Sequence, residues 1–369
     1  MSSNVYFFDF RSSGMKNNTI QKLQKLLQLE EFKDIFQPED LTAIKLHFGE
    51  KGNNAFVSPV YIRQCVDYLK SLGVKPFVTD TNTLYKGSRA NAIDHIRTAL
   101  EHGFSYPTIN APIIIADGLK SQDYSEVEIN QEHFKKVRIA NNIIEADSML
   151  VVSHFKGHEL SGYGGAIKNL AMGCAPVAGK MDQHSARPDV NESLCNGCGI
   201  CVKICDWNAY KIENNISKID KSLCVGCGKC LNICPQNAIY LDWETDINEF
   251  IKRMTEYAYG AIKNKQGKLL FINVVNNISP VCDCYGFNDI PIAENVGILA
   301  STDPLALDKA CFDLVNKAKP IRNSALPKDY KQGDDKFKAI HPYVDSMSQI
   351  SYGEKVGLGI GIYNLQKIN

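Results

Sequence analysis

A chain of 369 residues in which 41 basic side chains balance 41 acidic ones has no long-range field to gather nucleic acid or an anionic membrane surface. Hydrophobic residues make up 44% of the chain and charged residues 22%, as in ordinary globular proteins, and no window approaches the roughly 20 apolar residues of a membrane helix. The N-terminus lacks the basic start and apolar run of a secretory signal, so we expect a cytoplasmic protein that binds neither nucleic acid nor membranes.

The first part of the chain alternates short apolar runs with amphipathic segments. Several runs are apolar throughout, which is typical of strands in a sheet covered on both faces. Alternating strands and helices predict an α/β domain with a largely parallel sheet, and Gly73 is placed to end one helix in a left-handed conformation. The pattern predicts strands over residues 5–10, 41–48, 75–79, 111–116 and 148–153, and helices over 19–36, 59–72 and 90–102.

An internal repeat interrupts this alternation between residues 195 and 235. The spacing Cys-x2-Cys-x2-Cys-x3-Cys occurs twice, equivalent positions lie 29 residues apart, and Asn-Ala follows each copy at the same offset. This spacing is typical of ferredoxins that hold two [4Fe–4S] clusters, in which the fourth cysteine of each run binds the other cluster. We therefore predict one cluster on Cys195, Cys198, Cys201 and Cys234, and a second on Cys224, Cys227, Cys230 and Cys205.

Zinc and disulfides are the alternatives for these eight cysteines. A structural zinc site usually pairs two knuckles across a longer spacer, so four cysteines in one run exceed its needs. Pro235 follows the second run as the ferredoxin pattern expects, whereas Asp206 stands at the equivalent position of the first. Clustering of most cysteines in one short stretch indicates a metal module in a reducing compartment.

After residue 246 the α/β alternation resumes. A helix is predicted over 247–263, strands over 269–275 and 295–300, and a helix over 304–317. Pro304 is well placed to begin this last helix, and Ser301, Thr302 and Asp303 are the candidates to cap it. We expect an α/β host domain made of residues 1–188 and 243–369, forming one discontinuous domain or two lobes. An α+β ferredoxin-like module with two [4Fe–4S] clusters is expected between them, in residues 189–242.

Polar side chains gather where the strand over 148–153 ends. His154 and His158 are candidate proton donors or metal ligands, and Lys168 is a candidate charge, proton donor or Schiff-base amine. Gly164 and Gly165 allow backbone N–H groups to close around an anion at the start of the next helix. The alternative is a structural turn with solvated charges.

Two other strand ends carry polar residues. Asp80, Lys86 and Arg89 are candidate ligands for a polar or carboxylated substrate, with helix capping as the rival interpretation. His47 lies at a further strand end.

Five cysteines lie outside the repeat. Cys282 and Cys284 are candidates for a further metal site or a redox pair if their segment is a loop, and Cys174 is another candidate thiolate. For these three, inert burial is the alternative. Cys65 and Cys311 fall on apolar helix faces and are expected in the core.

Several passages together resemble the Domain of Unknown Function 362 family of iron–sulfur proteins, and the resemblance runs over nearly the whole chain. The passages are HFGE at 47–50, TDTNTLY at 79–85, ADGL at 116–119, HFKGH at 154–158, GGAIKN at 164–169, DPLALD at 303–308 and the cysteine repeat. The resemblance implies a cytoplasmic 4Fe–4S protein of bacteria or archaea. The segment 158–168 is also similar to the His…Gly-Gly…Lys passage of nickel-pincer lactate racemases, in which the lysine carries the cofactor.

These observations favour a redox protein whose two [4Fe–4S] clusters pass low-potential electrons to or from a polar site with Lys168, His154 and His158 at its centre. Its partner would be a redox protein or a small-molecule substrate. One alternative is an electron-transfer subunit that docks on a partner oxidoreductase. Another is a protein that holds an additional metal or organic cofactor at Lys168 or at the Cys282/Cys284 pair.

Overall fold

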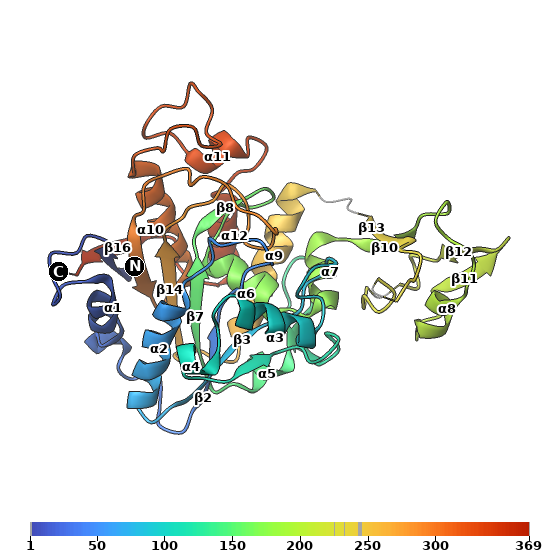
Figure 1. Cartoon of the computed structure of the whole chain (residues 1–369), viewed down its shortest axis with the longest axis horizontal. Coiled ribbons are helices and arrows are strands. Elements are labelled where there is room, and N and C mark those ends of the chain that lie inside the picture. The colour runs from blue at the N-terminus through green and yellow to red at the C-terminus, as the bar shows by residue number, and fades with distance from the viewer. Residues whose placement is uncertain (1, 225, 232, 243–245, 369) are drawn as a thin grey trace.

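One eight-stranded sheet runs through the body of the protein, whose computed structural model describes residues 2–224, 226–231, 233–242 and 246–368 (Figure 1). β15 runs antiparallel to both of its neighbours, and every other neighbouring pair in the sheet is parallel. In spatial order the strands are β16 (Tyr363–Lys367), β1 (Ser3–Asp9), β15 (Gly297–Ser301), β14 (Leu269–Val275), β7 (Ser148–His154), β2 (Leu41–Lys45), β3 (Lys75–Asp80) and β4 (Ile113–Ile115). The sheet is therefore largely parallel, as predicted.

Helices cover both faces of this sheet, which is why its central strands are buried along their whole length. Alternate residues of β7 enter opposite cores, with Leu150 and Val152 on one side and Met149 and Val151 on the other. The first core is closed by α1 (Thr19–Leu27), α2 (Pro59–Ser71), α3 (Ala92–Glu101) and α4 (Tyr106–Ile109). The second is closed by α6 (Ala166–Cys174), α9 (Ile247–Ile262), α10 (Pro304–Lys317) and α12 (Ser348–Val356).

Smaller elements complete the chain. Two hairpins, β5 (Tyr124–Glu128) with β6 (Lys136–Ala140) and β8 (Lys156–His158) with β9 (Gly162–Gly164), lie outside the main sheet. The short helices are η1 (Glu30–Phe32), α5 (Asn141–Glu145), α7 (Val177–His184) and α11 (Lys336–Ile340). Among the described residues, none of the helices combines the length and apolarity needed to cross a bilayer.

Residues 187–242, here named the cysteine-rich segment, project from the body beyond α7 (Figure 1). β10 (Arg187–Val190) pairs with β13 (Ile239–Asp242), β11 (Tyr210–Glu213) pairs with β12 (Ile216–Ile219), and α8 (Ile200–Ile204) follows the first glycine-rich loop. Strands that precede and follow this segment share the one main sheet. The expected boundary at residue 243 lies outside the described residues.

Most predicted elements are present, with changes at their ends. The helix predicted over 19–36 was too long, because the chain leaves the helix after Leu27 and Leu29 is extended before the 3-10 turn of η1. Phe32 and Phe36 are nevertheless buried in the same core as Leu26. Because these residues still face that core, the apolar positions keep a helix-like spacing beyond the end of the helix. Gly73 does adopt the predicted left-handed conformation, with φ of +78°.

The carboxylate of Asp303 joins both chain ends to α10. It accepts hydrogen bonds from the backbone N–H groups of Leu305 and Ala306, from the Ser3 hydroxyl at 2.8 Å and from the Ile360 N–H at 2.7 Å. We expect Asp303→Ala to destabilise the protein by about 2 kcal/mol or more, because it removes a helix cap and leaves further donors unpaired.

Denaturant unfolding followed by circular dichroism would measure this loss. Asp34→Ala is the matched control, because Asp34 is exposed, and should change stability by less than about 0.5 kcal/mol. Equal unfolding midpoints for the two variants would contradict the assignment.

Candidate functional sites

The two cysteine runs have the same backbone conformation. Left-handed φ angles recur at equivalent positions: +68° at Gly197 and Gly226, +74° and +76° at Gly199 and Gly228, and +51° and +50° at Asn208 and Asn237. Only Gly, and to a lesser degree Asn, enters this region at low cost. The repeated Gly and Asn residues are therefore required by the shape of each loop.

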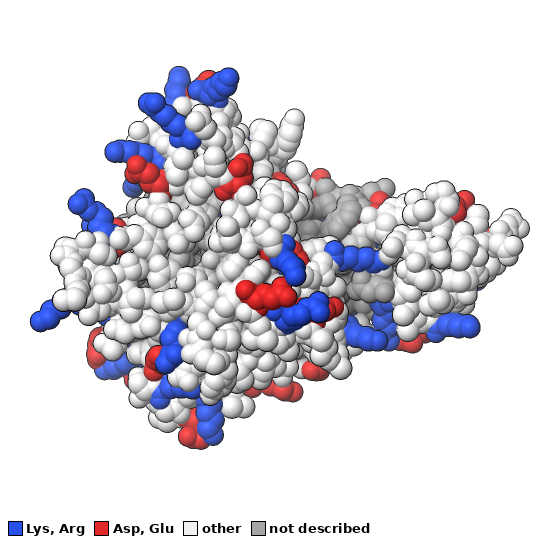
Figure 2. Space-filling model, viewed as in Figure 1, with Lys and Arg blue, Asp and Glu red and all other residues white. Residues whose placement is uncertain are grey.

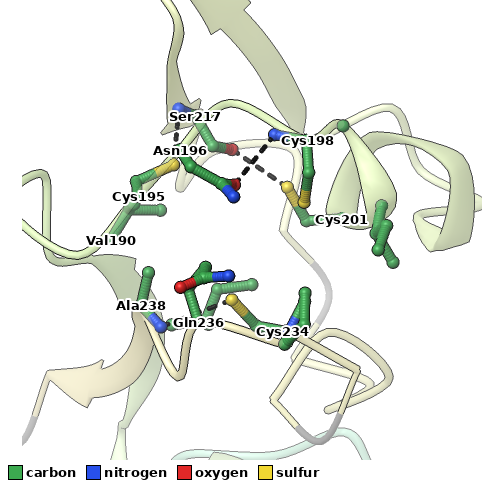
Figure 3. Close-up of a pocket in the computed structure, with 13 residues that line it drawn as sticks. Val190, Cys195, Asn196, Cys198, Cys201, Ser217, Cys234, Gln236 and Ala238 are labelled. Atoms are coloured by element: carbon green, nitrogen blue, oxygen red, sulfur yellow. Dashed lines mark hydrogen bonds between the residues drawn. The ribbon is translucent and has the colours of Figure 1, made fainter.

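Each cavity in the cysteine-rich segment is lined by four cysteines, three from one run and the fourth from the other. Figure 3 shows the first cavity, where the sulfurs of three cysteines face Cys234 across the opening. The cavities enclose about 340 and 330 Å³ of space free of protein atoms, including the part open to solvent. The first is lined by Cys195, Cys198, Cys201 and Cys234, and the second by Cys205, Cys224, Cys227 and Cys230. These are the two sets that the spacing predicts.

The Asn-Ala pair after each run supplies a hydrogen bond to the fourth sulfur of that run. The Ala209 N–H donates to Cys205 Sγ at 3.4 Å, and the Ala238 N–H donates to Cys234 Sγ at 3.3 Å. The left-handed asparagine before each alanine turns the backbone toward the sulfur. This contact explains why Asn-Ala recurs at the same offset.

Two hydroxyl side chains add hydrogen bonds that differ between the cavities. Ser217 lies beside the first, with its N–H 3.3 Å from Cys195 Sγ and its hydroxyl 3.1 Å from Cys201 Sγ. Tyr210 donates its hydroxyl to Cys230 Sγ at 3.2 Å in the second. Donors aimed at sulfur stabilise negative charge on the thiolates.

The described cysteines do not converge as a single metal ion requires. Zinc holds sulfur at about 2.3 Å, so its four ligands must meet around one atom. Among the described residues, no group of three or more His, Cys, Asp or Glu side chains is arranged in that way.

The second cavity lies on the side of the cysteine-rich segment that faces the body. A Cβ on Gly228, which lines this cavity, would be 2.5 Å from Cγ1 of Val177 on α7. Leu84, in the loop after β3, belongs to the same apolar cluster as Val177 and Cys230. Lys86 of that loop donates to Asn237 at 2.6 Å. This predicted substrate ligand thus contacts the cysteine-rich segment.

A second polar site lies at the carboxyl edge of the sheet, where the loops after four neighbouring strands meet. β14, β7, β2 and β3 are adjacent and parallel, so their C-terminal ends share one edge, the usual ligand edge of such sheets. The loop after β14 supplies Cys282 and Cys284 in a turn closed by the Tyr285 N–H to Cys282 C=O bond at 3.1 Å.

Lys168, on α6, donates from Nζ to Cys282 Sγ at 3.0 Å. The hydrogen bond from the Cys284 thiol lowers the pKa of Cys282 most, burial opposes the shift, and Lys168 lowers it further, so the pKa of Cys282 lies well below its ordinary value. Burial is the largest single influence and lowers the pKa of Lys168, but Cys282, Cys284 and Glu159 together outweigh it and raise the pKa. Cys282 and Lys168 therefore form a thiolate–ammonium pair, and the pKa of Cys284 is raised by its hydrogen bond to that thiolate.

His158 is a neutral donor beside this pair. Its Nδ1 accepts the N–H groups of Leu160 and Ser161, both at 3.2 Å, so Nδ1 carries no proton and Nε2 must carry it. Burial, followed by the charge of Lys168, lowers the pKa of His158 well below its ordinary value. The imidazole therefore stays neutral.

His154 is not directed at the thiols but holds the residue between them. Its Nδ1 lies 2.9 Å from Asp283 Oδ1, and its Nε2 lies 2.8 Å from the Asn276 carbonyl. Lys156 adds an ion pair to the other Asp283 oxygen at 3.5 Å. Although burial acts in the opposite direction, His154 and Lys156 together hold the pKa of Asp283 below its ordinary value. His154 thus acts as a positioning residue for the turn.

At the start of α6, where the sequence suggested that an anion could bind, the structure places a carboxylate of the protein itself. Asp308, on α10, accepts the N–H groups of Ala166 and Ile167 at 2.8 and 3.0 Å. A Cβ on Gly165 would lie 2.4 Å from Asp308 Oδ1, and one on Gly164 would lie 2.9 Å from Cδ of Lys168. The two glycines admit this carboxylate and the lysine, so an external anion would have to displace Asp308.

Asp80 and Arg89 belong to a buried ionic network. Asp80 pairs with Lys45 at 3.0 Å and with Arg89 at 3.4 Å, and Arg89 pairs with Glu50 at 3.2 Å. Arg89 also donates to the Tyr85 hydroxyl at 2.7 Å. These side chains already have charged partners within the protein, and they fix the β2 and β3 loops.

His47 and Cys174 are the remaining candidates from the sequence. His47 is half-buried and accepts the Gly49 N–H at 3.0 Å, and burial lowers its pKa well below the ordinary value. Cys174 is buried in the apolar core, and burial raises the pKa of its thiol to about 11. Cys65 and Cys311 are buried in the core, as expected.

Sequence reasoning missed three residues that organise the sites. Asp308 caps α6, Asp283 anchors the thiol turn, and Ser217 forms hydrogen bonds with two cysteine sulfurs. A signal existed for two of them, since Asp283 stands between the two cysteines and Asp308 ends the DPLALD passage. Ser217 lies between the two cysteine runs and outside both copies of the repeat, so the sequence held no signal for it.

The fold and the site define a class of protein: a mixed α/β protein with thiols at the carboxyl edge of its sheet. A family described as a domain of unknown function (DUF362) matches residues 42–313, and the chain belongs to this family. No match was found among curated proteins.

Two solved structures are similar to parts of this chain. The lactate racemase apoprotein from Thermoanaerobacterium thermosaccharolyticum has 13% identity and a TM-score of 0.37, covering 75% of this chain and 51% of its own. A protein from Thermotoga maritima has 10% identity and a TM-score of 0.37, covering 73% and 52%. The chain thus spans about half the length of each. Likeness at this level assigns no function.

The thiolate–ammonium pair makes a prediction about pH. The pKa of Cys282 is depressed, so the wild type should keep this thiolate as pH falls below the ordinary range of thiols. Lys168→Met removes the neighbouring charge and should raise the pKa of Cys282, so the thiolate is lost at a higher pH.

Ultraviolet thiolate absorbance, titrated in each protein against the Cys282→Ser variant of the same background, would measure this shift. Lys168→Arg keeps the charge and serves as the control. Identical titrations for Lys168→Met and the wild type would rule out the pairing.

Proposed function

We propose that this chain binds two [4Fe–4S] clusters through its cysteine repeat and exchanges electrons between them and the thiol site at the carboxyl edge of the sheet. The observation that carries the proposal is the division of the eight cysteines between two cavities, each completed by one cysteine from the opposite run. Clusters of this kind supply one-electron transfer at potentials set by ligands, hydrogen bonds to sulfur and exposure.

The chain's own residues provide what such a role requires. The amides of Ala209 and Ala238 and the hydroxyls of Ser217 and Tyr210 are aimed at cysteine sulfurs, where negative charge has to be held. Cys198, in the first cavity, is exposed, which suits contact with an external electron donor or acceptor.

The second cavity faces the body, and the loop after β3 leads from it to the thiols. Leu84 belongs to the same apolar cluster as the cavity residue Cys230, and Cys284 is among the groups that raise the pKa of the next residue, Tyr85. Lys168, His158 and Cys282 then supply a cation, a neutral proton donor and a thiolate at the end of this path. In this proposal Asp80 and Arg89 shape the loops around the site.

A second candidate function is an electron-transfer subunit that docks on a partner oxidoreductase in the cytoplasm. Exposed apolar side chains on the cysteine-rich segment favour it, including Trp207 at 55% exposure beside the second cavity and Leu194 at 50%. The face of the segment seen in Figure 2 also carries few charged side chains. The two functions differ in whether Lys168 and Cys282 affect electron transfer.

Crossed ligation can be tested by counting iron after anaerobic reconstitution. The wild type should bind about eight irons per chain. Cys195→Ala combined with Cys234→Ala removes two ligands of the same cavity and should leave about four irons. Cys195→Ala combined with Cys205→Ala removes one ligand from each cavity and should leave far fewer.

Equal iron contents in the two double variants would contradict the crossing. Zinc, or no metal, in the oxygen-protected wild type would overturn the proposal itself.

The hydroxyl donors give a second prediction. Tyr210→Phe should lower one of the two reduction potentials and Ser217→Ala should lower the other, because a lost donor destabilises the more negative, reduced state. Potentiometric titration followed by electron paramagnetic resonance would resolve the two changes. If both variants changed the same potential, the assignment of these residues to separate cavities would be wrong.

A further inference from the structure

We infer that Cys282 and Cys284 form a reversible dithiol–disulfide couple that takes up electrons in pairs, an inference that rests on the proposed function for its electron source. The couple would be the acceptor at the end of the path from the cysteine-rich segment.

The turn brings the two sulfurs together. Cys282 and Cys284 are the first and third residues of a β-turn closed at 3.1 Å by Tyr285, and the Cys284 N–H donates to Cys282 Sγ at 3.4 Å. The Cys284 thiol is also hydrogen-bonded to the Cys282 sulfur. A disulfide requires Cα atoms about 4.4–6.8 Å apart, and consecutive Cα atoms are about 3.8 Å apart, so two cysteines separated by one residue in a turn lie within that reach and the bond can form without unfolding the loop.

The surroundings favour a thiolate and disfavour a metal ion. The Lys168 ammonium lies 3.0 Å from Cys282 Sγ, where it attracts a sulfur anion and would repel a metal cation. The nearest carboxylate in sequence, Asp283, is held by His154 and Lys156. Within the described part of the chain, no group of three metal-binding side chains includes these cysteines.

The two sulfurs have different access to solvent. Cys282 has 0% exposure, whereas Cys284 is partly exposed. In the disulfide, an external thiolate would attack the more accessible sulfur of Cys284 and release Cys282 as the thiolate beside Lys168.

The electron count is balanced by the proposed clusters. Reduction breaks the Cys282–Cys284 S–S bond with two electrons and one proton, which yields the Cys282 thiolate and the Cys284 thiol. The proton enters from solvent at Cys284. Two [4Fe–4S] clusters give up one electron each, so a pair of one-electron donors matches one two-electron acceptor. Oxidation reverses each of these changes.

The first test follows the disulfide directly in the full chain, reconstituted without oxygen. After equilibration in mixtures of reduced and oxidised dithiothreitol, free thiols are alkylated and the peptide containing both cysteines is weighed. We expect it to switch between a doubly alkylated form and an unalkylated disulfide with one two-electron midpoint. Cys65, buried in the core, should not change with the redox buffer and serves as the internal control.

The second test counts electrons with reduced methyl viologen as the donor. Cys284→Ser should take up two fewer electrons per chain than the wild type at equal iron content, and Cys65→Ala should take up as many as the wild type. In the dithiothreitol titration, Lys168→Met should make the disulfide harder to reduce by about tenfold or more, because the ammonium stabilises only the reduced form. Lys168→Arg should restore part of that difference.

The outcomes separate this inference from the cluster proposal. If Cys284→Ser holds the same iron and takes up as many electrons as the wild type, the couple is refuted and the cluster proposal stands. If the wild-type peptide switches but the protein holds no iron, the couple stands and the clusters are refuted. A peptide that stays alkylated in every buffer also overturns the inference, and this measurement needs no variant to fold.

Discussion

Four thiols from two separate stretches of chain meet at each cavity of the cysteine-rich segment, and this convergence determines the local structure around them. A run of three cysteines can surround a guest only if the loop between them turns through left-handed positions, which glycine provides at low cost. The fourth thiol comes from the other run, so the runs must lie side by side. The antiparallel pair of β10 and β13 and the hairpin of β11 and β12 hold them in that arrangement.

In the body of the protein, burial of charge is the corresponding constraint. The side chains of Lys45, Asp80 and Arg89 are almost fully buried. Burying any one of these charges without its oppositely charged partner would cost folding free energy. Their ion pairs tie the ends of β2 and β3 together, while Asp308 ties α6 to α10. The edge of the sheet is therefore rigid where Lys168 approaches Cys282. A rigid site can hold a thiolate–ammonium pair in place without rearrangement, which a mobile surface lysine could not do.

The sequence was most informative where local spacing determines the structure. Cysteine spacing predicted which four thiols line each cavity, and apolar periodicity predicted α2 and α10 to within a residue. The sequence could not reveal contacts between segments that are far apart in the chain. Lys168 and Cys282 are separated by 114 residues and meet only because β7 and β14 are adjacent in the sheet. The sequence could not reveal that β15 runs antiparallel to its neighbours either, because an apolar run has the same pattern in both chain directions.

The same limit applies to residues for which the sequence could not distinguish a structural role from a ligand-binding role. His154, Asp80 and Arg89 have the composition of a substrate site, yet buried polar residues that serve each other look identical in sequence to those that serve a ligand. What distinguishes them is whether their hydrogen-bonding capacity is already used within the fold.

The position of the cysteine-rich segment shows why the host domain matters to it. α7 begins at Val177, against the loop of the second cavity, and ends at His184, where burial, followed by the charge of Lys168, lowers the pKa to about 3. A helix of 8 residues is about 12 Å long, so one short element connects the two sites. Leu84 and Tyr85 form a second, independent connection. A segment whose only task was to diffuse between partners would need neither contact.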